Sequence, residues 1–190
     1  MQLVPEDYEY DLTDDLEPGW QTMEVLKQTI ITRLNESEIQ QAAFVGMQRC
    51  AYAISHFKEI SGYENKWQRE IEGALAEFAF AKLMDIHWDG KIGVVGKGDV
   101  GSWEVRHTHN PDGHLLLQPG DLNHAPFVLL TGQAGLYTVR GWIIGRDGKL
   151  KEYWGDKANT GRPCFWVPQS DLLPMERHSA FPNSSYKEIA

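Results

Sequence analysis

The stretch Lys97–Thr108, KGDVGSWEVRHT, contains the strand from which the fold can be predicted. Asp99 and Glu104 flank a glycine turn, and a short segment with apolar residues follows the turn. Successive residues of a strand face opposite sides of a sheet, so Glu104 and Arg106 should share one face while Val105 points the other way. The pattern therefore predicts a strand that presents an acid and a guanidinium side by side.

The segments that precede this strand have the spacing of helices. Apolar residues recur every three or four positions over residues 20–34, which predicts a first helix. A second helix is predicted over residues 37–60, with Asn35 or Ser37 as its N-cap. A third is predicted over residues 65–84, and on it Glu70, Gly73 and Glu77 stack on one face.

Short β-like runs, separated by Gly, Asp and Asn, follow the helices. Arg146-Asp147-Gly148-Lys149 predicts a hairpin turn that would pair the last two runs as antiparallel strands. The overall prediction is an α+β fold in which N-terminal helices pack on a small mixed sheet. The predicted strands cover residues 92–95, 103–107, 115–118, 127–131, 137–144 and 150–154.

The bulk composition predicts a single domain with an acidic leader. A chain of 190 residues that is 42% hydrophobic is long enough for one buried core and short for two. We predict a flexible leader over residues 1–19, one domain over residues 20–180 and a loose tail over residues 181–190. The chain has no apolar run of membrane-spanning length and an acidic start unlike a signal peptide, so a cytoplasmic protein without membrane contact is expected.

The net charge of -9 argues at first against a nucleic-acid partner. The first 26 residues hold eight acids and no Lys or Arg, however, which leaves 19 acids against 18 bases in the rest of the chain. That remainder is almost neutral and has enough cations for a local basic face. The leader is either a solvated tail or a mimic of a nucleic-acid strand that competes for the site.

Glu77 is the strongest candidate for a functional carboxylate on the third helix. It lies among alanines and phenylalanines, where a purely structural glutamate would lose hydration without an obvious gain. Its alternative role is to pair with Lys82 or Arg106. Together with Asp99 and Glu104 it offers hard oxygen ligands of the kind that Mg²⁺ prefers. Asp99 and Glu104 have structural alternatives as well, as a turn residue and as half of a charge pair with Arg106.

The segments EGALAEFAFAK (72–82) and GDVGSWEVR (98–106) resemble the core of the PD-(D/E)XK nuclease-like superfamily, with its restriction endonuclease-like fold. The resemblance implies a metal-dependent nuclease that hydrolyses DNA with Mg²⁺, or with Mn²⁺ in its place. By position, Glu77 matches the helix glutamate, while Asp99 and Glu104 match the metal-binding acids. Arg106 stands where the motif has lysine. Possible outer residues of the site are Glu70 and Gln118.

Two features depart from the superfamily pattern. The segment between Gln118 and Phe127 has no room for the helix that normally lies between the third and fourth strands. Arg106 stays protonated and cannot act as a base, although it can clamp a phosphate or stabilise developing charge. Lys82 and Lys97 are candidates to replace the lysine spatially.

Other functions are compatible with the same residues. A catalytically inactive relative would use the scaffold to bind DNA or a protein partner, as a regulatory protein of phage or mobile-element type. A small interaction protein of viral or mobile-element type would hold its acids for structural reasons. The histidines His107, His109, His114 and His124 form a rival zinc constellation, although the turn that begins at Asn110 redirects the chain between them.

Overall fold

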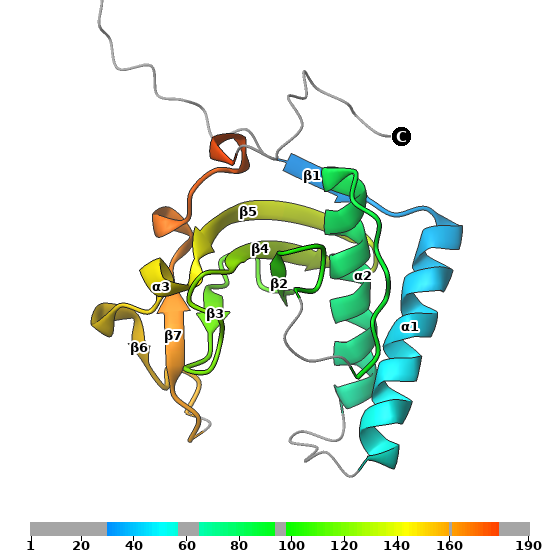
Figure 1. Cartoon of the computed structure of the whole chain (residues 1–190), viewed down its shortest axis with the longest axis horizontal. Helices are drawn as coiled ribbons and strands as arrows, with labels where there is room; N and C mark the ends of the chain where they lie inside the picture. Colours follow the sequence, from blue (N-terminus) through cyan, green and yellow to red (C-terminus); the bar gives the residue numbers. More distant parts are fainter. Residues whose placement is uncertain (1–29, 57–64, 94–97, 160, 179–190) are drawn as a thin grey trace, which may run out of the picture.

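The computed structural model describes residues 30–56, 65–93, 98–159 and 161–178. These residues form two long helices, a four-stranded mixed sheet and a smaller three-stranded sheet, which confirms the α+β prediction (Figure 1). The predicted leader and the predicted C-terminal tail lie outside the described residues. Within the described part of the chain, no helix combines the length and apolar character needed to cross a membrane.

The regular elements follow one another along the chain from β1 to β7. The long helices are α1 (Glu36–Ser55) and α2 (Lys66–Met84), and a single short turn of helix, α3, covers Gly145–Gly148. The strands are β1 (Ile30–Arg33), β2 (Glu104–Thr108), β3 (Leu115–Leu117), β4 (Pro126–Gln133), β5 (Leu136–Ile144), β6 (Trp154–Gly155) and β7 (Cys164–Val167).

The two long helices largely match their predicted ranges. Asn35 caps α1, since its side chain accepts a hydrogen bond from the backbone N–H of Glu38 at 3.0 Å. The carboxylate of Glu38 accepts one from the Asn35 N–H at 2.7 Å, which completes a capping box. Residues 57–60 of the predicted second helix lie outside the described residues. The helix α2 ends at Met84, and its C-cap residue Asp85 adopts a left-handed conformation with φ of 53°.

The prediction that the first helix extends to Leu34 is wrong for residues 30–33. They form the strand β1, which pairs antiparallel with β5. The run Ile30-Ile31-Thr32 is β-branched and suits a strand, and tertiary pairing overrides the apparent helical spacing. Thr32 and Leu34 are buried while Ile31 and Arg33 are exposed, so the segment has the alternation of a half-buried strand.

The main sheet has the strand order β1-β5-β4-β2, so β2 is an edge strand. The strands β4 and β5 form a hairpin, and β2 pairs parallel to β4. The two-residue turn of the hairpin is Ala134-Gly135, whose φ angles of 53° and 86° are typical of the type I′ turns that match the strand twist. As the sequence predicts, no helix lies between β3 and β4.

A separate hydrophobic core lies on each face of the main sheet. The helix α2 packs on one face, and α1 packs on α2 (Figure 1). On that side Val128 and Leu130 of β4 are buried against Leu75 and Phe80 of α2. The opposite face of β4 is buried against the small sheet β3-β7-β6, through Phe127, Leu129, Leu115, Leu117 and Val167.

The hairpin predicted at residues 146–149 is wrong. Residues 146–148 lie in α3, and Lys149 follows it. A hydrogen bond from the Arg146 N–H to the carbonyl of Asn123, at 2.8 Å, fixes the start of α3. Residues 151–153 then form a 3₁₀ turn, and β6 pairs with β7. Residues 92–93 of the predicted strand 92–95 are not in a strand, and residues 94–97 lie outside the described residues.

Candidate functional site

The candidate site lies where the chain enters the edge strand β2. In a parallel pair, half of the backbone groups of an edge strand face away from the sheet and need other partners. The N–H of Val105 donates to the carboxylate of Asp99 at 2.8 Å. Asp99 is therefore fixed beside the open edge of β2, on the turn that precedes the strand.

Arg106 is surrounded by three carboxylates. One terminal nitrogen of its guanidinium lies 2.9 Å from the carboxylate of Asp121. The other terminal nitrogen lies 3.4 Å from Glu104 and 3.9 Å from Asp99. The four side chains are 18–30% exposed, so this is a partly buried cluster of three acids around one cation.

Packing fixes the orientation of the Arg106 side chain. Its Nε donates to the carbonyl of Leu116 on β3 at 3.2 Å, and its guanidinium lies 4.9 Å from the centre of the Phe127 ring. Phe127 belongs to the core on the small-sheet side, whereas Val105 belongs to the core on the helix side. The prediction that Glu104 and Arg106 share one face and Val105 takes the other is confirmed.

Glu77 lies in the interface between the two helices, and Arg49 of α1 holds it there. The guanidinium of Arg49 donates to the two oxygens of the Glu77 carboxylate at 2.6 and 2.7 Å. The indole N–H of Trp88 donates to the same carboxylate at 3.1 Å. Burial raises the pKa of Glu77 above its ordinary value, an effect that these donors oppose.

The negative charge of Asp99 acts both on Glu104, beside Arg106, and on Glu77, in the interface between the helices. Burial, followed by the negative charge of Asp99, raises the pKa of Glu104, and Asp121 adds to the rise. Asp99 also adds to the rise in the pKa of Glu77. Glu77, Asp99, Glu104 and Asp121 carry four negative charges when ionised, whereas Arg49 and Arg106 carry two positive charges. These four acids and two arginines together have a formal excess of two negative charges.

Glu77, Asp99 and Glu104 were predicted to hold one metal ion together, but among the described residues they do not converge as its ligands. The oxygens of Glu77, Asp99 and Glu104, all within the described residues, do not lie within 4.8 Å of one another as a group. Within the same part of the chain, Glu72, His107 and His109 do reach that separation. His114 and His124 are not part of that group, so the four-histidine zinc constellation is not formed.

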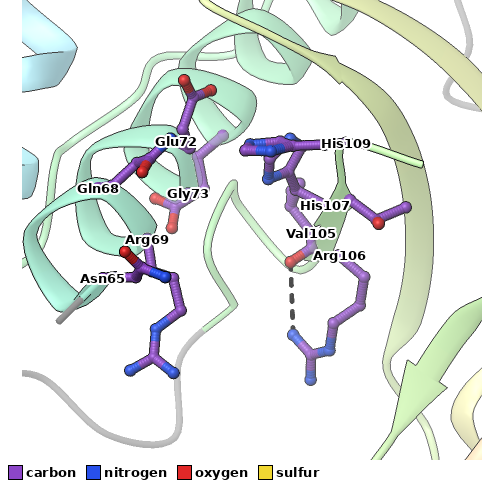
Figure 2. Close-up of a pocket in the computed structure, with 11 residues that line it drawn as sticks. Asn65, Gln68, Arg69, Glu72, Gly73, Val105, Arg106, His107 and His109 are labelled. Carbon is purple, nitrogen blue, oxygen red and sulfur yellow. Dashed lines mark hydrogen bonds between the residues drawn. The ribbon is translucent and has the colours of Figure 1, made fainter. Parts of the chain in front are cut away.

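A cavity of about 530 Å³ lies between α2 and β2 and adjoins the carboxylate cluster. Figure 2 shows the α2 side chains on one side of this cavity and the β2 side chains on the other. Arg69 and Arg106 extend toward the same end of the cavity in this view. The lining residues are Asn65, Gln68, Arg69, Glu72, Gly73, Glu77, Val105, Arg106, His107, Thr108 and His109.

The remaining sequence candidates that the structure describes do not line the cavity. Glu70 does not line the cavity, and its charge acts on Arg49 at the α1 side. Gln118 follows β3, and its backbone N–H donates to Asp121 at 2.8 Å. The amine of Lys82 donates to Glu38 at 2.9 Å and to the carbonyl of Arg33, so it is engaged at the start of α1. Lys97 lies outside the described residues.

Sequence reasoning missed three residues of this region. Asp121 lies in the turn PGDLNHAP, where an aspartate has an ordinary role in turn formation, so nothing signalled its contact with Arg106. Arg49 lies on the second predicted helix without a motif. The amine of Lys91 lies 3.1 Å from the carboxylate of Asp89 and donates to the carbonyl of Gly98 at 3.2 Å, so a lysine contacts the residue that precedes Asp99.

Comparison with known proteins finds no family model that matches this chain. It also finds no significant match among curated proteins or among solved structures.

Proposed function

We propose that this protein is a metal-dependent nuclease that hydrolyses phosphodiester bonds of DNA on a restriction endonuclease-like core. The observation that carries the proposal is the group of acids around Arg106 and Arg49, which has a formal excess of two negative charges. An excess of two matches the charge of one divalent cation. Burial and mutual repulsion make the ionised form of Glu104 costly, and a bound cation would relieve that cost.

The donor chemistry fits Mg²⁺, with Mn²⁺ as a substitute. Asp99 and Glu104 offer hard carboxylate oxygens at the open edge of β2, and Asp121 offers a third on the same side. Mg²⁺ is bound by one or two carboxylates while substrate phosphate and water complete its shell. When bound, the metal would polarise the phosphodiester and lower the pKa of a water molecule.

The side chains of the protein have separate roles in this proposal. Arg106 is the cation that stabilises negative charge on the phosphate, since guanidinium remains protonated and presents several donors. Arg49 and Trp88 hold the Glu77 carboxylate in place. Lys91, beside Gly98, takes the place of the motif lysine and orients the attacking water.

The cavity beside the acids suits a nucleic-acid strand. It is lined by Arg69 and Arg106, which can contact phosphate, and by the polar side chains of Asn65 and Gln68. The net charge of the whole chain is negative, so binding is expected to depend on this local surface and on the metal rather than on a broad basic face.

The test is cleavage of plasmid, linear and single-stranded DNA in the presence of Mg²⁺ or Mn²⁺. Wild type should cut, and Glu104→Gln should lose cutting while its circular dichroism spectrum and melting temperature remain those of a folded protein. Glu152→Gln is the matched control, because Glu152 is exposed and does not line the cavity. Equal cutting by wild type and Glu104→Gln would refute the assignment of this carboxylate.

A second candidate function is binding of DNA without cleavage. One observation favours it: the acids are already paired with guanidinium groups. Arg49 donates to both carboxylate oxygens of Glu77, and Arg106 contacts Asp99, Glu104 and Asp121. The variant Arg106→Lys separates the two functions. Wild type that does not cut, together with Arg106→Lys that does, would identify a silenced nuclease whose role is binding.

A further inference from the structure

We propose that Glu72, His107 and His109 form a transition-metal site, with Zn²⁺ as the expected ion, separate from the acids proposed to hold Mg²⁺. One ligand atom from each of the three residues lies within 4.8 Å of the other two. Two imidazoles and one carboxylate form a ligand set that zinc adopts with a fourth position left for water or substrate. The proposal does not depend on nuclease activity.

The two histidines come from one strand and its extension. His107 is in β2, and His109 follows the strand by one residue, so the two side chains lie on the same side at a spacing of two. Their ring centres are 5.1 Å apart. Glu72 reaches the pair from α2, across the cavity (Figure 2).

A backbone hydrogen bond sets the tautomer of His107. Its Nε2 lies 2.8 Å from the carbonyl oxygen of Gly132, which can only accept, so Nε2 carries the proton in the neutral ring. Nδ1 then has a free lone pair. Metal-binding histidines commonly donate their second ring N–H to a carbonyl in this way, which fixes the ring for coordination.

The carbonyl that orients His107 is itself held firmly. Gly132 has a φ of 138°, a conformation that favours glycine. A Cβ added at this position would collide with the carbonyl oxygen of Leu136 across the β4–β5 hairpin. The backbone at this position is therefore determined by the hairpin rather than by the site.

The Glu72 carboxylate is oriented by the same hairpin. Its oxygens accept hydrogen bonds from the backbone N–H of Ala134 at 3.2 and 3.3 Å. One of them also accepts a hydrogen bond from the hydroxyl of Tyr137 at 2.8 Å. Tyr137 is only 1% exposed, so its hydroxyl is a fixed donor in the wall of the site. Two ligands thus have outer partners before any metal binds.

The donor set favours zinc over magnesium. Imidazole nitrogen suits Zn²⁺ and related transition metals, whereas Mg²⁺ prefers oxygen. The cavity of about 530 Å³ leaves the fourth position accessible to a small ligand, and Arg106 lines the same cavity.

The test is titration of the metal-free full-length protein with Zn²⁺ by calorimetry, followed by Co²⁺ as a spectroscopic probe. Wild type should bind one Zn²⁺ at this site, and the Co²⁺ form should show the visible absorption of a low-coordinate nitrogen-oxygen site. His107→Ala and Glu72→Gln should each weaken Zn²⁺ binding by about 100-fold or more, and Tyr137→Phe by about tenfold.

Matched controls distinguish this site from other metal binding. His114→Ala and His124→Ala remove histidines outside the group and should leave Zn²⁺ affinity unchanged. Asp99→Asn should also leave it unchanged, which separates this proposal from the nuclease proposal. Circular dichroism establishes that each variant is folded. Zinc binding that His107→Ala and Glu72→Gln leave intact, or that His114→Ala weakens equally, would overturn the proposal.

Discussion

Arg49 of α1 binds both carboxylate oxygens of Glu77 on α2, at 2.6 and 2.7 Å, with side-chain exposures of 18% and 9%. The two helices are thus joined by an ion pair within their packed interface. Burial lowers the pKa of Arg49, but the hydrogen bond and charge of Glu77 outweigh it and raise that pKa overall. Arg49 therefore remains the cation that compensates the buried carboxylate.

Removal of Arg49 should destabilise the fold far more than removal of the whole pair. Arg49→Met leaves Glu77 buried without its main partner, which is expected to cost about 3–5 kcal/mol in the free energy of unfolding. In the double variant Arg49→Met/Glu77→Gln neither position of the pair carries a charge, so much of that loss should be recovered. Urea unfolding measures both. Arg33→Met, at an exposed arginine, should change stability by about 0.5 kcal/mol or less.

Two helical glycines should respond in opposite directions to alanine. A Cβ at Gly46 would lie 2.5 Å from the Ile71 Cα, in the contact between α1 and α2, so Gly46→Ala should cost about 1–3 kcal/mol. A Cβ at Gly73 meets no atom within 4 Å, so Gly73→Ala should stabilise the protein by about 0.5–1 kcal/mol. Thermal unfolding measures both, and equal effects would contradict the helix packing described above.

His178 should make stability depend on pH in the mildly acidic range. Its ring lies 4.4 Å from that of Trp103 and 4.8 Å from that of Trp142, and burial lowers its pKa. The unfolded chain therefore takes up a proton more readily than the folded protein. The stabilising effect is complete above the ordinary pKa of about 6.5 and decreases as pH falls through and below that value.

The variant His178→Phe tests this dependence. The drop in melting temperature between about pH 7.5 and about pH 5.5 should be smaller in His178→Phe than in wild type. Burial also lowers the pKa of His107, so some pH dependence should remain in the variant. His124→Gln, at an exposed histidine, should keep the wild-type drop. An unchanged drop in His178→Phe would show that His178 is not the responsible group.

Mg²⁺ should stabilise the folded protein if the acids around Arg106 bind it, an expectation that depends on the proposed nuclease function. At an ion concentration about 100 times the Kd, the gain is about 2.7 kcal/mol. Asp99→Asn should lose most of the increase in melting temperature, because Asp99 couples the acids of both sides of the site. Glu72→Gln should retain it. Equal stabilisation of wild type and Asp99→Asn would place the ion elsewhere.

The local features of the fold were determined by the sequence alone. Asn35 has the residue type of a helix cap and caps α1, and the spacing of residues 65–84 matches α2. Because side chains alternate along a strand, Glu104 and Arg106 were predicted to share one face of β2 and Val105 to take the other. The two hydrophobic cores confirm this, since Val105 belongs to the helix-side core and Arg106 lies over Phe127 of the other core. These features depend on residues a few positions apart, whose relative directions the backbone geometry fixes.

Tertiary structure decided everything that depends on distant partners. Residues 30–33 form a strand because β5 offers an edge, and residues 145–148 form a helical turn because the loop before β4 supplies hydrogen-bond acceptors. The contact of Asp121 with Arg106 and the approach of Glu72 to His107 join segments with no shared motif. Such contacts depend on how the sheet and helices pack together. A local pattern of residues cannot predict which distant segments come into contact.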